Sequence, residues 1–194
     1  MSQPGLLDSG VLLDDDSGRF EYREGFLTAG EAEAALLDLT TAVRWVAQRR
    51  EMYGREVDVP RLTASYRLDE RRIPASIAAL APRVVAAVGA PFNAVGLNLY
   101  RDGNDSVAMH NDHLYEIAVG HPIALLSLGG PRTMVIAAKR PPRRRLVLEL
   151  QPGSLLVMDH ASQHHYDHGV PKQRGPVAPR ISLAFRVKAP RAAA

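Results

Sequence analysis

Residues 146–158, Leu-Val-Leu-Glu-Leu-Gln-Pro-Gly-Ser-Leu-Leu-Val-Met, place two short apolar runs on either side of a Pro-Gly turn. The same alternation of apolar runs and turn residues extends outward in both directions, through 94–100, 124–128, 133–137 and 181–187. Short runs that are this frequent and this regularly interrupted are typical of a β-sandwich or barrel. The sequence from Phe92 onward therefore predicts a mainly β core.

Two helices are predicted upstream of this core. Thr28 and Glu31 form the sequence pattern of a helix capping box, in which each side chain caps the backbone of the other residue. Apolar residues at helical spacing follow the box and predict a helix over 29–41. The same spacing predicts a second helix over 74–88.

The remaining N-terminal segments complete the expected organisation. Residues 45–69 are strand-like with Pro60 as a break, and residues 1–25 are expected to form an irregular, polar lead-in. We therefore expect an α+β, mainly β fold in one compact domain. A helical layer with a lid is expected over 1–91, and a β core over 92–188.

Composition limits the possible partners and metal ligands. The 194 residues include 24 Lys and Arg against 21 Asp and Glu, with a pI near 9.4, and this mildly basic balance permits nucleic acid as a partner without requiring one. The chain has no cysteine, so any metal must be held by His and carboxylates. No apolar run approaches the roughly 20 residues that cross a bilayer, and the acidic start does not resemble a signal peptide. We expect a cytoplasmic monomer without a membrane partner.

Three residues have the pattern of an iron site. His110 and Asp112 are two apart, so both side chains lie on one face of an extended segment. With the distal His168 they would form the two-histidine, one-carboxylate triad of non-haem Fe(II) oxygenases, which leaves coordination positions open. Alone, His-X-Asp is more often a surface turn, and the other histidines near His168 are expected to be loop residues: His160, His164 and His165.

The last predicted strand carries two arginines on one face. Arg180 and Arg186 share that face with small residues, which is an unusual composition for a core. Guanidinium groups pair bidentately with carboxylates and stay charged when buried, so this face suits a dicarboxylate cosubstrate. Asn98 and Tyr100 share one face of an earlier strand. An ordinary exposed strand face is the alternative interpretation of the arginine pair.

These motifs in this order resemble the AlkB family of Fe(II)/2-oxoglutarate dioxygenases, over roughly residues 58–187. The resemblance implies a double-stranded β-helix (jelly-roll) core, with His110, Asp112 and His168 as catalytic iron ligands. It also implies that 2-oxoglutarate is bound by Asn98, Tyr100, Arg180 and Arg186. The cofactors it implies are Fe(II) and 2-oxoglutarate, with O2.

The substrate side departs from the family pattern. The family places acidic residues directly after the iron Asp, whereas this chain has His113-Leu114-Tyr115. The segment from Pro60 to Tyr66 resembles the family's substrate lid, so Arg61 and Tyr66 are expected to contact the target base, with His113 as a second candidate for stacking. An ordinary strand aromatic in the core is the alternative interpretation of Tyr66. The basic run 139–145 is expected to contact phosphates. The predicted contacts in this run are Arg143, Arg144 and Arg145; a solvated hairpin tip is the alternative.

The resemblance implies oxidative dealkylation of alkylated or etheno-adducted bases in DNA or RNA, a form of DNA repair. Because a base inside a duplex is out of reach, the target would be single-stranded or flipped out. A second hypothesis keeps the dioxygenase chemistry with a small-molecule or protein substrate. A third is a non-enzymatic module with a structural metal, which would not need the arginine pair.

Overall fold

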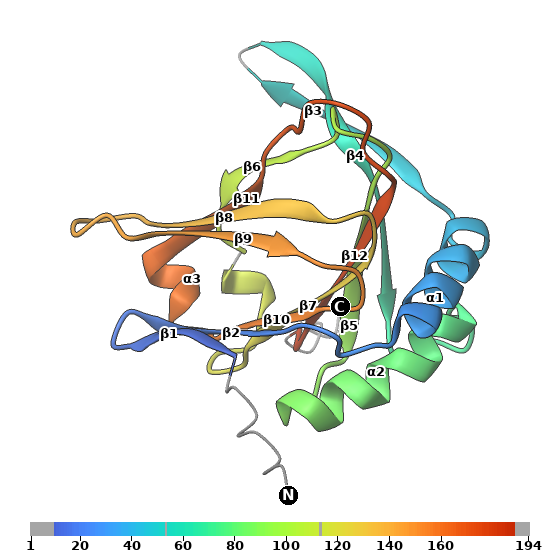
Figure 1. The fold of residues 1–194 in the computed structure, drawn as a ribbon, viewed down its shortest axis with the longest axis horizontal. Helices are drawn as coiled ribbons and strands as arrows, with labels where there is room; N and C mark the ends of the chain where they lie inside the picture. The colour runs from blue at the N-terminus through green and yellow to red at the C-terminus, as the bar shows by residue number, and fades with distance from the viewer. Residues whose placement is uncertain (1–9, 53, 113, 189–194) are drawn as a thin grey trace, which may run out of the picture.

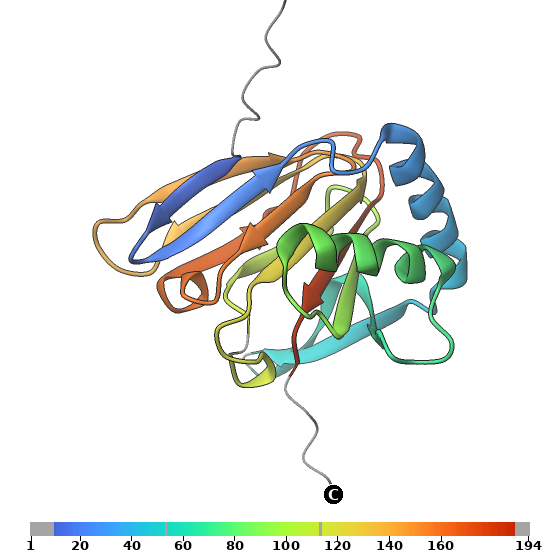
Figure 2. The ribbon, with the colours of Figure 1, turned by 90° about the horizontal axis from the view of Figure 1, so that it is seen from below.

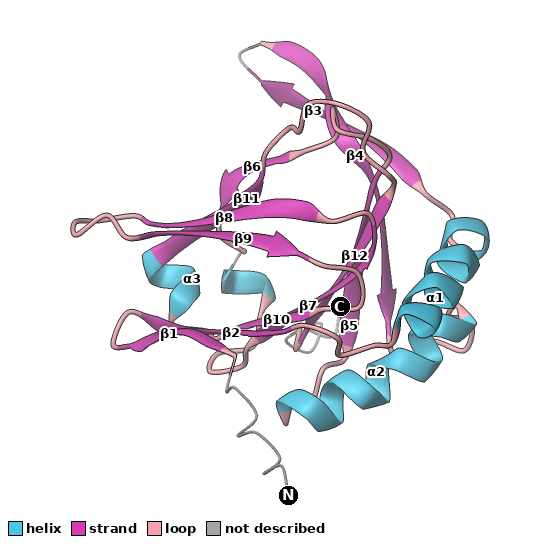
Figure 3. Ribbon diagram, in the orientation of Figure 1, coloured by secondary structure: helices cyan, strands magenta, loops and turns pink. Residues whose placement is uncertain are grey.

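A computed structural model describes residues 10–52, 54–112 and 114–188. Most of its elements are strands, and two longer helices lie together at one side (Figure 1; Figure 3). The helices are α1 (Ala29–Ala42), α2 (Ala75–Val88), the single-turn α3 (Ser162–His165) and a 3-10 turn (Leu114–Glu116). The strands are β1 (Val11–Asp15), β2 (Gly18–Arg23), β3 (Val46–Met52), β4 (Arg55–Arg67), β5 (Ala94–Tyr100), β6 (Val107–His110), β7 (Ile123–Gly129), β8 (Arg132–Ala138), β9 (Arg145–Leu150), β10 (Leu155–Met158), β11 (Tyr166–Val170) and β12 (Arg180–Arg186).

The strands form two antiparallel sheets. One has eight strands in the order β1-β2-β10-β7-β12-β5-β4-β3, and the other has four in the order β6-β11-β8-β9. One cluster of buried apolar side chains joins residues of the eight-stranded sheet, such as Leu125 and Leu156, to Met134 and Ile136 of the four-stranded sheet. The two sheets therefore face each other across a shared core, which is the predicted jelly-roll arrangement.

The opposite face of the eight-stranded sheet is covered by the helices (Figure 2). Leu39 of α1 and Val84 of α2 pack with Leu97, Leu183 and Phe185 in a second apolar cluster. Thr28 caps α1 through the predicted box: its side chain accepts from the Glu31 backbone N–H, and the Glu31 carboxylate accepts from the Thr28 N–H. One face of this sheet is thus sealed, and the other is left to line the space between the sheets.

Two expectations about the N-terminal half are wrong. Residues 11–23, predicted to be irregular, form β1 and β2, and β2 pairs with β10 at the side of the large sheet. Pro60 does not break the strand-like segment but lies inside β4. It is tolerated because the β3–β4 pairing shifts register between Ala47 and Arg49, and the β4–β5 pairing begins only at Leu62.

Candidate metal and cosubstrate site

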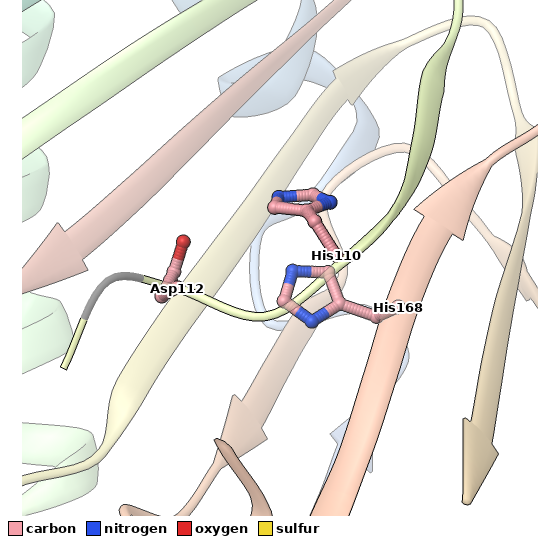
Figure 4. A group of neighbouring side chains, drawn as sticks. All are labelled: His110, Asp112 and His168. Carbon is pink, nitrogen blue, oxygen red and sulfur yellow. The ribbon is translucent and has the colours of Figure 1, made fainter. Parts of the chain in front are cut away.

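The predicted metal ligands converge between the two sheets. His168 of β11 stands directly opposite His110 of β6 in the antiparallel register, and their ring centroids are 4.6 Å apart. Asp112 follows β6 by two residues, and its carboxylate lies beside the two rings (Figure 4). One ligand atom from each residue lies within 4.8 Å of the others. In the part of the chain that the structure describes, this is the one group of His, Asp and Glu close enough to hold a metal ion.

The orientation of His110 suits metal binding. Its Nδ1 lies 2.9 Å from the carbonyl oxygen of Ala108, so Nδ1 carries the proton and donates to that oxygen. This tautomer leaves Nε2 with a free lone pair. Metal-bound histidines commonly have such a backbone contact on the other ring nitrogen, because it fixes the orientation of the ring.

Asp112 is held as a carboxylate by the second strand arginine. Arg186 donates from Nε and Nη2 to both carboxylate oxygens of Asp112 at 2.9–3.1 Å. Burial is the largest single influence and would raise the pKa of Asp112, but the charge and hydrogen bonds of Arg186 together with the neighbouring His168 and His110 outweigh it and hold this pKa below its usual value. The triad therefore has its anionic ligand in charged form at neutral pH.

His168 is the most buried ligand, with 6% of its surface exposed. Burial, followed by the neighbouring His110, lowers the pKa of His168 from 6.5 to about 4. The ring is neutral well below pH 7, which is the form that binds a metal.

The pKa of His168 predicts a specific dependence of stability on pH. Because the folded pKa of about 4 lies below the unfolded value of 6.5, the unfolded chain binds more protons between these limits. The metal-free protein should therefore be most stable above pH 6.5 and should lose on the order of 3 kcal/mol as the pH falls to 4. Urea unfolding at a series of pH values measures this loss. His168→Asn should flatten the curve over that range, and an equal slope in the variant would refute the assignment.

Arg180 forms the floor of a buried anion site. It is 1% exposed, its Nη2 donates to Ser127 Oγ at 2.9 Å, and its guanidinium lies 5.3 Å from the ring centre of Tyr100. Its Nε and Nη1 are also buried but have no hydrogen-bond partner among the described residues. A buried guanidinium with two unsatisfied donors indicates an anionic ligand that pairs with it. A carboxylate of 2-oxoglutarate fits this requirement.

The strand register brings the predicted cosubstrate residues together. Arg180 pairs with Tyr100, and Ser182 with Asn98, so the predicted faces of β12 and β5 coincide. Small residues on this face leave space for a ligand; Arg186 lies across Gly96, where a Cβ would be 3.2 Å from its Nη1. The metal triad and the anion site therefore share one side of the sheet, joined by the contact of Arg186 with Asp112.

The lid residues are divided between the two faces of β4. The Nε of Arg61 donates to Asn98 Oδ1 at 2.8 Å, so Arg61 belongs to the site. Tyr66 pairs with Val95 in register and packs against the helix-covered cluster, on the opposite face from Asn98. The predicted stacking role of Tyr66 is therefore wrong, because strand alternation turns its ring into the core. His113 lies outside the described residues.

The basic run is a hairpin that projects from the small sheet between β8 and β9 (Figure 1). The three arginines predicted to contact phosphates, Arg143, Arg144 and Arg145, are exposed. Arg144 forms an ion pair with Asp15, the last residue of β1. Arg143 and Arg145 are the better candidates for phosphate contact.

Several residues of the site were missed in the sequence. Ser127 holds Arg180, and Gln163, 2% exposed, accepts from the Asp112 backbone N–H at 3.1 Å. Arg132, 1% exposed, lies beside Tyr100 and donates to the carbonyls of Asp102 and Asp105. The sequence did contain a signal for Arg132. This residue lies in a strand whose inward-facing residues are otherwise apolar, and an inward-facing arginine needs buried partners. Of the other histidines, His164 and His165 lie in α3 and His160 just before it, and none joins the metal group.

Comparison with known proteins agrees with this geometry. Residues 20–186 match the model of the 2OG-Fe(II) oxygenase superfamily. The chain is 35% identical over 157 residues to the DNA oxidative demethylase ALKBH2 of Bos taurus, covering 71% of this chain and 56% of that protein. It is 32% identical over 189 residues to the human alpha-ketoglutarate-dependent dioxygenase alkB homolog 3, covering 86% of this chain and 65% of that protein.

The chain thus spans less than two thirds of the length of these relatives. Among solved structures, the non-haem alpha-ketoglutarate-dependent epimerase SnoN superposes with a TM-score of 0.59 at 18% identity, over 86% of this chain and 78% of that one. This likeness shows the fold alone. No helix in the described residues is long and apolar enough to span a membrane. The matched family model and the relatives together show that the chain belongs to the 2OG-Fe(II) oxygenase superfamily and, within it, to the AlkB family.

Proposed function

We propose that this chain is an Fe(II)/2-oxoglutarate-dependent dioxygenase that oxidatively dealkylates damaged bases in DNA, with RNA as a further substrate to test. The observation that carries the proposal is the His110–Asp112–His168 group beside a buried arginine with unsatisfied donors, on one face of the sheet. DNA is supported as the substrate by the name of the related ALKBH2 proteins. We also propose that the protein is a cytoplasmic monomer. Size-exclusion chromatography would test the oligomeric state.

The residues divide into two sets. His110, Asp112 and His168 would hold Fe(II), which when bound supplies the oxidising chemistry with O2 and 2-oxoglutarate. Arg180 and Tyr100 would bind the far carboxylate of 2-oxoglutarate, while Arg186 and Asn98 orient the end nearer the metal. Because Arg186 also holds Asp112, one guanidinium would align the metal ligand and the cosubstrate.

The substrate side supports a preference for particular lesions. In place of the acidic residues after the iron Asp, the described chain has Leu114 and Tyr115, and the nearest carboxylate, Glu116, lies 3.3 Å from the Lys188 ammonium. No carboxylate at these positions is free to read an exocyclic amine. We therefore propose that bridged adducts such as etheno bases, which offer no free amine, are accepted at least as well as methylated bases. Within residues 1–91, the β3–β4 hairpin with Arg61 would serve as the substrate lid. It would face the core formed by residues 92–188.

The proposal is tested by mass spectrometry of short oligonucleotides that carry 1-methyladenine, 3-methylcytosine or 1,N6-ethenoadenine. The protein is supplied with Fe(II), 2-oxoglutarate and oxygen, and a parallel reaction omits 2-oxoglutarate. Restoration of the normal base only in the complete reaction supports a dealkylase. Formation of succinate without repair of any lesion would refute the nucleic-acid substrate and leave a dioxygenase with a different substrate.

The basic hairpin provides a separate prediction about DNA affinity. Arg143→Glu with Arg145→Glu should weaken binding to a single-stranded oligonucleotide by at least about 10-fold at low salt, and the slope of log affinity against log salt should fall by about 2. Fluorescence anisotropy at several salt concentrations measures both. Arg71→Glu with Arg72→Glu is the matched control, because these exposed arginines precede α2 on the helix-covered side and carry the same change of charge. An equal loss in both double variants would indicate a general charge effect and no hairpin contact.

A further inference from the structure

Lys139, the first residue of the basic run, turns inward. Its side chain is 28% exposed. Its ammonium Nζ donates to Asn111 Oδ1 at 3.0 Å and to the backbone oxygen of Gln163 at 2.8 Å. The Asp167 carboxylate lies 3.7 Å from the same ammonium. Two of the three ammonium donors therefore have hydrogen-bond acceptors in the protein, and Asp167 adds a longer ion-pair contact. Although the residue is partly exposed, the Lys139 ammonium is bound by neighbouring residues and differs in this from the arginines at the hairpin tip.

Each partner of Lys139 is either next to a triad residue in the chain or hydrogen-bonded to one. Asn111 stands between His110 and Asp112 in the chain. Asp167 directly precedes His168. The two segments that carry the triad thus meet at one ammonium group.

The third partner, Gln163, completes the connection. Its side-chain oxygen accepts from the Asp112 N–H at 3.1 Å, and its buried side chain is fixed by a bond from Nε2 to Ser162 Oγ at 3.2 Å. Lys139 is itself anchored, because its backbone N–H donates to the His165 oxygen at 2.9 Å and the preceding β8 residues pair with β11. The lysine therefore approaches the triad from a rigid support.

This support acts on a segment that lies just beyond the end of a strand. Asp112 follows the end of β6 and has no sheet partner in the described structure, so its backbone position depends on contacts from outside the strand. Arg186 already holds the Asp112 carboxylate, so what other contacts can add is a fixed backbone, which keeps the carboxylate in place relative to the two histidines before the metal binds. Contacts to residues that orient metal ligands commonly affect metal affinity by about 10- to 100-fold.

We propose that Lys139 is a positioning residue of the metal centre, which holds the Asn111–Asp112 segment and the start of β11 in register, with Gln163 as its relay. The inference rests on the metal site of the proposed function. It assigns Lys139 to metal affinity and leaves phosphate contact to Arg143 and Arg145. The run 139–145 therefore divides into an inner support and an outer binding surface.

The test measures Mn(II) affinity directly, by electron paramagnetic resonance of the free ion during titration of the full chain without 2-oxoglutarate. Lys139→Met, which removes the ammonium but keeps most of the side-chain length, should weaken Mn(II) binding by about 10-fold. Lys172→Met is the matched control, since this lysine is exposed on a different loop, and should bind Mn(II) as the wild type does. Lys139→Arg, which keeps the charge and can reach the same oxygens, should recover part of the loss.

A double-mutant cycle separates positioning from general damage. Asn111→Ala removes the same contact from its other end, together with the Asn111 Nδ2 bond to the Asp112 backbone oxygen, so the double variant should lose less than the sum of Asn111→Ala and Lys139→Met. If Lys139→Met fails to fold by circular dichroism, the comparison of Asn111→Ala with the wild type carries the test. Wild-type Mn(II) affinity in Lys139→Met, or in Asn111→Ala, would overturn this inference alone. Absence of Mn(II) binding by the wild type would overturn the proposed metal site and this inference with it.

Discussion

Replacing Asp112 with alanine is expected to abolish both metal binding and base repair. Asp112 is the one anionic ligand of the triad and the bidentate partner of Arg186. Its removal leaves a half-buried guanidinium beside the metal position, where it repels a divalent cation. Breaking such a buried pair costs about 3–5 kcal/mol, and the same free energy taken from metal binding would be a loss of affinity of about 150- to 5,000-fold. Mn(II) titration and the oligonucleotide repair assay should both show the loss.

The control for this variant is Asp69→Ala. Asp69 is exposed in the turn after β4, and its nearest ion-pair distance, to Arg67, is 3.8 Å. It carries the same change of charge and volume without touching the triad, so its Mn(II) affinity and repair rate should match those of the wild type. Retention of Mn(II) binding by Asp112→Ala would place the metal elsewhere. A metal-binding but inactive Asp112→Ala protein would also contradict the assignment, because the two losses are expected together.

The core strands could be predicted closely because local signals decide them. Residues 94–100 form β5 as expected, and 155–158 form β10, since each apolar run ends at a turn residue with the required backbone freedom. Gly153, at φ 75°, is one such residue. The strands β1 and β2 were not predicted, because their sequences, Val-Leu-Leu-Asp-Asp and Gly-Arg-Phe-Glu-Tyr-Arg, are short and half polar. They are strands because β10, more than 130 residues away, supplies a partner.

The site was predictable in part, for a related reason. The spacing of His110 and Asp112 shows that the two side chains share a face, but it does not show that His168 lies opposite His110. The alternation of side chains along a strand shows which residues of β4 share a face with Tyr66. Only the packing of the helices decides which of the two faces is the core. The basic run was treated as one surface, whereas Lys139 points inward. Long-range pairing decides each of these points, and no local pattern records it.

Replacing Arg180 with methionine is expected to have opposite effects on binding and on stability. Methionine is an unbranched apolar side chain that fills irregular space but cannot pair with a carboxylate. Loss of the bidentate contact should raise the KM for 2-oxoglutarate by about 100-fold or more, on the scale of about 3–5 kcal/mol for a buried charge pair. Arg180→Lys should recover little of this loss, because a single ammonium does not reproduce the planar pair of donors.

The stability of Arg180→Met without cosubstrate should exceed that of the wild type. Burial lowers the pKa of Arg180 more than the neighbouring Tyr100 raises it, which indicates that the folded protein holds this charge at a cost. Two of its donors are unsatisfied in the described structure, and methionine removes that penalty. Urea unfolding should therefore show a higher midpoint for the variant in the absence of 2-oxoglutarate.

Adding 2-oxoglutarate should reverse this order. Binding to the folded state alone stabilises the wild type in proportion to the logarithm of ligand concentration, whereas the variant should not respond. Ser154→Ala is a control, because Ser154 is buried just before β10 and, in the described structure, its hydroxyl donates to the Gln151 carbonyl oxygen and makes no contact with Arg180. A variant that is less stable than the wild type without ligand would mean that Arg180 supports the fold. The predicted crossing would mean that the chain keeps an unpaired buried charge because its partner is the cosubstrate.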